Sequence, residues 1–404
     1  MSAPVSERRR LLISGILLAL AVAQLSMPVS GWSQSAHDSI TQFVYTSDAH
    51  YGVTRPRFQG GTNVDAHTVN AAMVGAMNEL PTRTLPCDDG GVRACQPVGA
   101  IEFVVETGDI ANRSEALPTT PVTYIQSAAA SWDQFEADYI RGILLTGKNG
   151  NRAELFLVPG NHDVTNAIGF YRPMSPKTDA TVMANIFNLM LNPTTPRTKD
   201  TYNYSSDKVF YSRDIGGVHF IFINMWPDSA ARAWMKEDLK KVDSTTPVVI
   251  FTHDQPDVES KHFINPNPPY DINAKDKFEN LLVDTFADAM TVNDASGAPV
   301  RPVLEQRDFV RFLKEYRNVV AYFHGNDNAN EFYTWSGPDK DISLSVFRVD
   351  SPMKGNVSAK DESKLSFHVV SIESSAKRMT VREYLWNTKT WGEAKTVSLA
   401  PRTN

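Results

Sequence analysis

The sequence has only two cysteines among its 404 residues, and it has no excess of positive charge. Two cysteines allow a single disulfide, which excludes a small scaffold held together by several disulfides. The formal net charge of −6 at pH 7 argues against a protein that binds nucleic acid through a summed positive field. No internal repeat is visible, and no apolar run reaches the ~20 residues that a membrane-spanning helix needs. From the negative net charge we expect no nucleic-acid partner.

What the chain does contain suits a globular protein with a large core. It is 42% hydrophobic, 21% charged and 10% aromatic, which excludes a disordered, collagen-like or coiled-coil chain. No linker rich in Pro, Gly and Ser divides the later part of the sequence. We therefore expect a single domain over residues 36–404, in which strands at about 341–390 complete the sheets.

The first residues have the pattern of a signal peptide. A basic segment precedes a 13-residue apolar run from Leu11 to Ala23, which is too short to cross a bilayer comfortably. We predict that residues 1–35 are a cleaved signal peptide and that the protein is exported, either periplasmic or secreted, without a permanent membrane anchor. The run Arg8 to Leu12 (RRRLL) also resembles a twin-arginine signal, so the route of export stays open.

Cys87 and Cys95 lie in a loop-like stretch, PCDDGGVRAC, whose glycine pair allows the chain to turn back. In an oxidising compartment this spacing predicts a short-range disulfide. A metal site built from these two residues alone would lack its other ligands.

Short apolar runs alternate with helical patterns along the chain. Continuous apolar runs of this length are typical of strands buried on both faces. The runs are Gln42 to Thr46, Ile101 to Glu106, Glu154 to Val158, His219 to Ile223, Pro247 to Phe251 and Val319 to Phe323. Apolar residues at helical spacing predict helices around 69–80, 125–139, 229–242 and 304–316. The alternation predicts an α/β fold built in layers.

Potential metal ligands follow five of these strands directly. The segments are Asp48-Ala49-His50, Gly108-Asp109, Gly160-Asn161-His162-Asp163, His253-Asp254 and His324-Gly325-Asn326-Asp327-Asn328. Ligand sites in open α/β sheets lie outside the carboxyl ends of the strands, so we expect the five loops to converge. Carboxylate, imidazole and amide oxygen together suit divalent ions.

Each fragment alone has an ordinary structural explanation. A Gly-Asp pair is most often a turn, Asn-His-Asp can cap a helix, and a histidine at the end of an apolar strand is usually hydrogen-bonded inside the core. Their order, each at the end of a strand, favours a shared site instead.

In this order the motifs resemble those of the calcineurin-like metallophosphoesterase family. The resemblance covers Gln42 to about Asn330, and the segment YNYSSDKVFYSRDIGGVHFIFINM is similar to the strand pair before the family's fourth motif. It implies a four-layer α/β/β/α sandwich of mixed sheets. Such enzymes carry metal-binding loops at the strand ends and two divalent ions.

The resemblance also assigns a role to each residue of the first four motifs. Asp48 and His50 would bind the first metal, and Asp109 would bridge both metals. Asn161 and His253 would bind the second metal. His162, paired with Asp163, would hydrogen-bond the phosphate or protonate the leaving group.

The last motif departs from the family pattern, which reads Gly-His-x-His. Here Asn326 and Asn328 replace both imidazoles, and we expect these amides to bind the metals in their place. Because amide oxygen is the harder ligand, we expect manganese or magnesium, with calcium, iron and zinc left open. His324 either compensates for the missing imidazoles or is a packed histidine at the strand end.

These features predict an exported metal-dependent phosphoesterase that acts on a small phosphoester. The alternative is a degenerate protein that binds metal or phosphate without catalysis. Monoesters and diesters stay open as substrates: export favours scavenging of monoesters, whereas the long loop from Asp254 to Lys277, with His262, Phe263 and Tyr270, suits a groove for a diester. The sequence does not specify the oligomeric state.

Overall fold

The computed structural model describes residues 40–112, 126–164, 179–258 and 303–403. These residues belong to one compact unit, Ser39–Asn404. The predicted signal peptide lies outside the described residues, as do His262, Phe263 and Tyr270 of the long loop.

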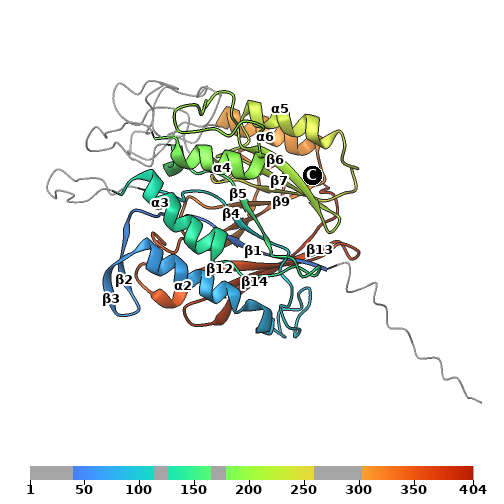
Figure 1. Ribbon diagram of the computed structural model, residues 1–404. Helices are drawn as coiled ribbons and strands as arrows, with labels where there is room; N and C mark the ends of the chain where they lie inside the picture. Colours follow the sequence, from blue (N-terminus) through green and yellow to red (C-terminus); the bar gives the residue numbers. More distant parts are fainter. Residues whose placement is uncertain (1–39, 113–125, 165–178, 259–302, 404) are drawn as a thin grey trace, which may run out of the picture. The chain divides into compact units, whose positions relative to one another are not determined.

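Two six-stranded mixed sheets form the centre of the fold (Figure 1). The first sheet has the order β14-β13-β12-β1-β4-β5 and the second has the order β10-β11-β9-β8-β7-β6. The strands of the first are β1 (Ile40–Thr46), β4 (Phe103–Glu106), β5 (Glu154–Leu157), β12 (Ser366–Glu373), β13 (Arg378–Leu385) and β14 (Thr390–Ser398). Those of the second are β6 (Phe210–Ile215), β7 (Val218–Ile223), β8 (Val248–Phe251), β9 (Val319–His324), β10 (Glu331–Trp335) and β11 (Leu344–Arg348). A separate hairpin pairs β2 (Thr54–Phe58) with β3 (Gly61–Asp65).

The strands that precede the motifs run parallel within each sheet. In the first sheet β1 pairs with β4 and β4 with β5, both in parallel. In the second sheet β7, β8 and β9 are also parallel neighbours. Their carboxyl ends therefore meet along one edge of each sheet, which is where loop residues can be gathered into a site.

Aromatic side chains from the two facing sheets pack against each other in the core. The ring of Phe43 on β1 lies 5.9 Å from Phe220, 5.8 Å from Phe251 and 6.0 Å from Phe323, all on the second sheet. Phe43 also stacks on Phe103 of its own sheet at 4.6 Å. Because every one of these rings is fully buried, the interface between the sheets is dry and close-packed, and it holds the two sets of strand ends in fixed positions.

Helices cover the outer faces of the sheets. The helical elements are α2 (Ala66–Asn78), η1 (Leu80–Thr82), α3 (Ala128–Phe135), η2 (Glu136–Arg141), η3 (His162–Val164), α4 (Thr181–Leu191), α5 (Ser229–Leu239), α6 (Val303–Glu315) and η5 (Glu362–Lys364). Side-chain caps begin α2 at Asp65 and α5 at Asp228, whose carboxylates accept backbone N–H groups in the first turn. In Figure 1, α2 and α3 flank the first sheet while α5 and α6 cover the second.

The fold class predicted from the sequence is confirmed. The six apolar runs form β1, β4, β5, β7, β8 and β9 within a few residues of the expected bounds. The strands after residue 341 complete the sheets, since β12 pairs with β1 and β11 with β9. The sequence analysis did not anticipate the β2–β3 hairpin, β10 or β14. Strand β14 is mostly exposed at the edge of the first sheet, so it lacks the apolar run by which the other strands were recognised.

Candidate metal centre

The loops after β1, β4 and β5 are joined to one another by backbone hydrogen bonds. The N–H of Asp48 donates to Gly108 O at 2.9 Å, and the N–H of His50 donates to Asp109 O at 2.8 Å. The N–H of His162 donates to the Oδ1 atom of Asp109 at 2.8 Å. Backbone N–H groups, with the Asp109 carboxylate as one of their acceptors, therefore hold the first three motifs together, as predicted from their positions at the strand ends.

Three residues of the first three motifs have the left-handed backbone conformation that non-glycine residues seldom adopt. The φ angles are 60° at Asp48, 47° at His50 and 56° at Asp109. Such conformations cost free energy, and they cluster at functional sites, where the surrounding structure enforces them. Here they turn three side chains toward one point.

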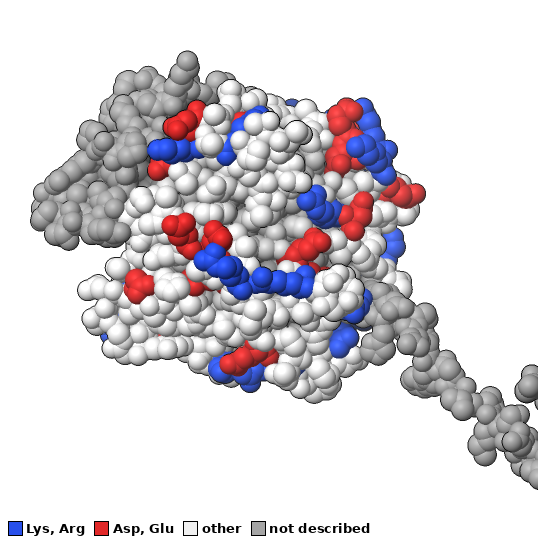
Figure 2. All heavy atoms as spheres, in the orientation of Figure 1, with Lys and Arg blue, Asp and Glu red and all other residues white. Residues whose placement is uncertain are grey.

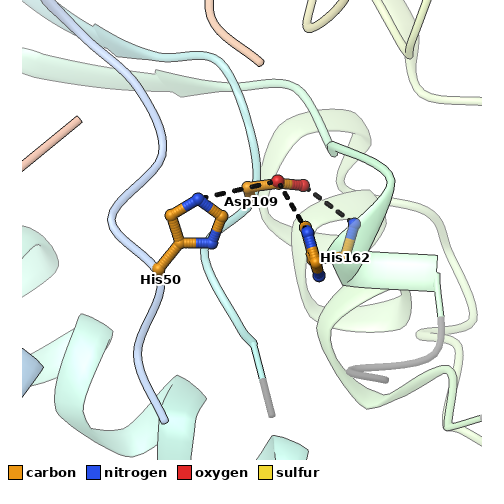
Figure 3. A group of neighbouring side chains, drawn as sticks. All are labelled: His50, Asp109 and His162. Atoms are coloured by element: carbon orange, nitrogen blue, oxygen red, sulfur yellow. Dashed lines mark hydrogen bonds and ion pairs between the residues drawn. The ribbon is translucent and has the colours of Figure 1, made fainter. Parts of the chain in front are cut away.

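The carboxylate of Asp109 lies at that point (Figure 3). Its Oδ2 atom is 3.8 Å from Nε2 of His50 and 3.6 Å from Nε2 of His162. Its Oδ1 atom is 3.4 Å from Nε2 of His253, which comes from the second sheet. Asp109 is 2% exposed and His253 is fully buried, so these polar groups interact away from water.

Two groups of side chains in the described residues have the spacing of metal ligands, and both contain Asp109. One group joins Asp109 to His50 and His162, and the other joins it to Asp48 and His253. The resemblance instead places Asp48 beside His50 on one metal. Both assignments use the same cluster of side chains, because Nε2 of His50 also lies 3.4 Å from Oδ1 of Asp48. Both make Asp109 the common ligand.

Several ligand atoms are buried without a hydrogen-bond partner in the part of the chain that the structure describes. They include Oδ1 of Asp48, Nε2 of His50 and Oδ1 of Asn328. A buried polar atom that lacks a partner costs about 1–3 kcal/mol, and native structures contain few. The Asp48 oxygen and the His50 nitrogen lie 3.4 Å apart and are suitable donors for a divalent ion, so these two residues fit the metal that the resemblance implies.

His253 and Asn161 are held in ligand-like orientations. The Nδ1 atom of His253 lies 2.7 Å from the carbonyl oxygen of Thr107, and its Nε2 atom lies 3.0 Å from Oδ1 of Asn161. An N–H···O=C bond at one ring nitrogen leaves the other available to a metal, which is the arrangement typical of metal-bound histidines. Burial acts to lower the pKa of His253, but the Asp109 carboxylate outweighs it and raises that pKa to about 10.

Burial and neighbouring charges also shift the pKa values of the other groups in the site. Burial acts to raise the pKa of Asp109, yet His253 and the other imidazoles hold it well below its ordinary value. Burial, followed by the positive charge of Lys354, lowers the pKa values of His50 and His162. At neutral pH the site without metal therefore contains an ionised Asp109 and neutral imidazoles at His50 and His162, whereas His253 is protonated and must release that proton to bind a metal.

The expected pairing of Asp163 with His162 is wrong. The Asp163 carboxylate accepts hydrogen bonds from the backbone N–H groups of Ala111 at 2.9 Å and Gly160 at 2.8 Å. His162 and Asp163 begin the short helix η3, in which successive side chains point about 120° apart. Asp163 therefore fastens the loop after β4 to the loop after β5, and it does not orient the imidazole.

The last motif lies at the site, but its two amides face different partners. Asn326 uses Nδ2 to donate to Oδ1 of Asp254 at 3.1 Å and to Oε1 of Gln255 at 3.2 Å. Asn328 uses Nδ2 to donate to the carbonyl oxygen of Asn326 at 2.8 Å, and its own Oδ1 has no partner among the described residues. Asn328 is thus better placed than Asn326 to offer an oxygen to a metal.

His324 is a packed histidine. Its Nε2 atom lies 2.9 Å from the hydroxyl group of Tyr333, and its Nδ1 atom lies 2.9 Å from the carbonyl oxygen of Gly325. The side chain is fully buried, which lowers its pKa to about 3. His324 does not replace either of the missing imidazoles.

Glycines permit the close approach of the motif loops. A Cβ atom on Gly160 would overlap Oδ1 of Asp109, and one on Gly325 would overlap Oγ of Ser47 and Oδ2 of Asp48. These two positions therefore require glycine for reasons of space.

One residue near the site was missed by the sequence analysis. Lys354, in the connection between β11 and β12, places its Nζ atom 3.4 Å from Nε2 of His162. Nothing in its local sequence, SPMKGN, signals a functional residue, because the contact spans 192 positions.

Cys87 and Cys95 form the predicted disulfide. Among the described residues, no helix has the length and apolar character needed to cross a membrane. On the face of the described chain drawn in Figure 2, acidic and basic side chains are interspersed.

The two facing sheets, the helices on their outer faces and the position of the five motifs at strand ends agree with what the sequence resemblance implies. No family profile and no curated protein matches the chain. Among solved structures, the chain is similar to a dimetal phosphatase from Danio rerio at 10% identity, with 89% of this chain and 99% of that chain covered and a TM-score of 0.47. It is similar to GAP50, the anchor in the inner membrane complex of Plasmodium, at 13% identity, with 90% of each chain covered and a TM-score of 0.42. It is also similar to a phosphatase from Mycoplasma pneumoniae at 10% identity, covering 90% and 94%, with a TM-score of 0.33. The function proposed below rests on the site itself.

Proposed function

We propose that this protein is an exported metal-dependent phosphoesterase that hydrolyses small phosphate esters with two divalent ions, manganese or magnesium. One observation carries the proposal. The buried carboxylate of Asp109 faces imidazoles from three separate loops, those of His50, His162 and His253, and it belongs to both candidate ligand groups. A carboxylate shared in this way is what two neighbouring ions require.

The remaining ligands would divide between the two ions. Asp48, His50 and the Oδ1 atom of Asn328 would serve the first, and Asn161 and His253 would serve the second. When bound, the ions would lower the pKa of a water molecule and neutralise charge on the phosphoryl oxygens.

His162 would act on the leaving group. Its ring lies at the edge of the cluster, with Nε2 3.6 Å from Asp109 and 3.4 Å from Lys354. A neutral imidazole can accept or donate one hydrogen bond at Nε2, depending on the tautomer. In its neutral form His162 would hydrogen-bond a phosphoryl oxygen, and in its protonated form it would pass a proton to the departing alcohol, which is general acid catalysis.

The test is Asp109→Asn in protein stripped with a chelator and then supplied with Mn²⁺. We expect the variant to lose nearly all hydrolysis of a chromogenic phosphate ester and to bind less metal, because the amide cannot bridge two cations. Asp200→Asn, at an exposed position, is the matched control and should retain both properties. Full activity in the Asp109→Asn variant would refute the proposal.

A second candidate is a protein that binds phosphate or a single metal without catalysis. The replacement of both imidazoles of the last motif by the amides of Asn326 and Asn328 favours it, because an amide oxygen binds a divalent ion more weakly than an imidazole does. Such a protein would saturate with phosphate and with one equivalent of metal, and it would release no phosphate from any ester with any divalent ion.

A further inference from the structure

A lysine lies beside the candidate metal centre. Lys354 is half-buried, and its Nζ atom lies 3.4 Å from Nε2 of His162. His162 is in turn 3.6 Å from the central carboxylate of Asp109. The ammonium group therefore lies next to the imidazole that would contact the substrate.

The backbone around Lys354 is fixed from two sides. Ser351 donates its hydroxyl hydrogen to the carbonyl oxygen of Asp48 at 2.8 Å, and the same hydroxyl oxygen accepts the N–H of Lys354 at 2.9 Å. Arg55, which is fully buried, donates to the carbonyl oxygens of Pro352, at 2.7 Å, and Ser358. The segment that carries Lys354 is thus hydrogen-bonded directly to the residue that supplies the first metal ligand.

The chemistry of an ammonium group restricts what Lys354 can do there. It has three donors and no acceptor, so it cannot bind a metal while it is charged. Beside two divalent cations it is repelled, unless an anion lies between them. A phosphoryl group bound to the metals is an anion at the right place.

We propose that Lys354 binds a phosphoryl oxygen of the substrate and makes the site selective for phosphate monoesters over diesters. A monoester carries close to two negative charges at neutral pH, whereas a diester carries one. The extra cation compensates the second charge, which a diester does not have. This inference rests on the proposed function and goes beyond it by naming the substrate class.

The experiment compares wild type with Lys354→Met, Lys354→Arg and Lys360→Met, all loaded with Mn²⁺. Lys360 is exposed in the same connection and serves as the matched control. For each protein, kcat/KM is measured with a chromogenic monoester and diester that share one leaving group, and inorganic phosphate binding is measured by calorimetry. We expect Lys354→Met to lose about tenfold to a hundredfold in monoester kcat/KM, to change little with the diester, and to bind phosphate more weakly. Arginine should restore part of the loss.

The outcomes separate this inference from the proposed function. Equal losses with both esters would overturn it, because Lys354 would then only position His162. If wild type hydrolyses neither ester, the proposed function fails, and the phosphate titration decides about Lys354 alone. Weaker phosphate binding in Lys354→Met than in Lys360→Met would then support an anion site, and equal binding would overturn it.

Discussion

The backbone N–H of Asn326 donates a 3.0 Å hydrogen bond to Oδ2 of Asp48, although 278 residues separate them. The bond joins the first motif to the last and brings the end of β9 against the end of β1. Because the main chain of Asn326 makes it, it does not depend on the side chain at that position. The last motif therefore keeps its place at the site while both imidazoles are replaced by amides, and only its ligand chemistry is altered.

The two amides should contribute unequally to metal binding. We expect Asn328→Ala to weaken Mn²⁺ binding by about tenfold or more, because it removes a buried oxygen that has no other partner among the described residues. Asn326→Ala should have a smaller effect, since its Oδ1 atom is not among the buried atoms that lack a hydrogen-bond partner. Titration calorimetry with chelator-stripped protein measures both. A larger loss in Asn326→Ala would reverse the assignment.

Restoring an imidazole should change which metal the site prefers. We expect Asn328→His to raise the affinity for Zn²⁺ more than that for Mn²⁺, because imidazole is the softer ligand. Metal analysis after dialysis against equal concentrations of both ions measures the ratio. The same substitution at Asn326 is the comparison, and an unchanged ratio in Asn328→His would show that position 328 does not reach the metal.

Gly325 should not tolerate even one added methyl group. In Gly325→Ala the new Cβ would overlap Oγ of Ser47 and Oδ2 of Asp48, so we expect weaker metal binding and a loss of about 1–3 kcal/mol in the free energy of unfolding. Gly75→Ala is the control: Gly75 lies inside α2 with open space around its Cβ position. That change should stabilise the protein by up to about 1 kcal/mol. Denaturant unfolding and a metal titration of both variants check the pair, and retained metal affinity in Gly325→Ala would contradict the expectation.

The sequence was sufficient to predict that most of these motif residues lie together, because the signal is local. An apolar run followed at once by Asp48, Asp109 or His253 specifies both the strand and the position of the candidate ligand at its carboxyl end. Parallel pairing of the strands then brings these ends together. Because the pairing involves the strands, their ends meet whatever the number of residues between the motifs.

The features that the sequence did not predict depend on contacts that no local pattern encodes. Whether Asp163 faces His162 or the backbone of Ala111 depends on a single turn of η3. The contact of Lys354 with the site depends on how Ser351 and Arg55 hold its segment. The β2–β3 hairpin turns at Gln59 and Gly60, both with positive φ, and the apolar runs used to find the other strands are missing there. In each case the outcome depends on tertiary structure and not on a local sequence pattern.

The disulfide should stabilise the protein without affecting the metal site. Cys87 and Cys95 close a short loop that is docked on β13, where Asp89 pairs with Arg382 at 2.5 Å and the N–H of Val92 donates to Oγ1 of Thr380. The loop-entropy model gives about 2.5 kcal/mol for a closure of this length. We expect the Cys87→Ser, Cys95→Ser double variant to melt at a lower temperature, to match reduced wild type, and to bind Mn²⁺ normally. Loss of metal binding in the double variant would contradict this separation.

His219 on β7 should make the stability depend on pH. Its Nδ1 atom lies 2.7 Å from Oδ1 of Asp214, and its Nε2 atom lies 2.9 Å from Oδ2 of Asp238 on α5. Burial acts to lower the pKa of His219, but hydrogen bonds to the two carboxylates outweigh it and raise that pKa above its ordinary value. Burial acts to raise the pKa of Asp238, and its hydrogen bond with His219 outweighs this and lowers it.

The sign of the effect follows from these two shifts. A histidine with a raised pKa contributes its full stabilisation below its unfolded pKa of about 6.5, and it loses that contribution as the pH rises through the folded value. We therefore expect the melting temperature of His219→Gln to fall furthest below wild type at about pH 5–6, where Asp238 is still ionised, and the difference to shrink as the solution becomes alkaline. Asp214→Asn should show a weaker form of the same trend, because Asp214 is exposed and Asp238 remains. Thermal unfolding of the three proteins from pH 5 to pH 9 measures this, and a difference that stays constant across the range would show that His219 stabilises the helix by packing alone.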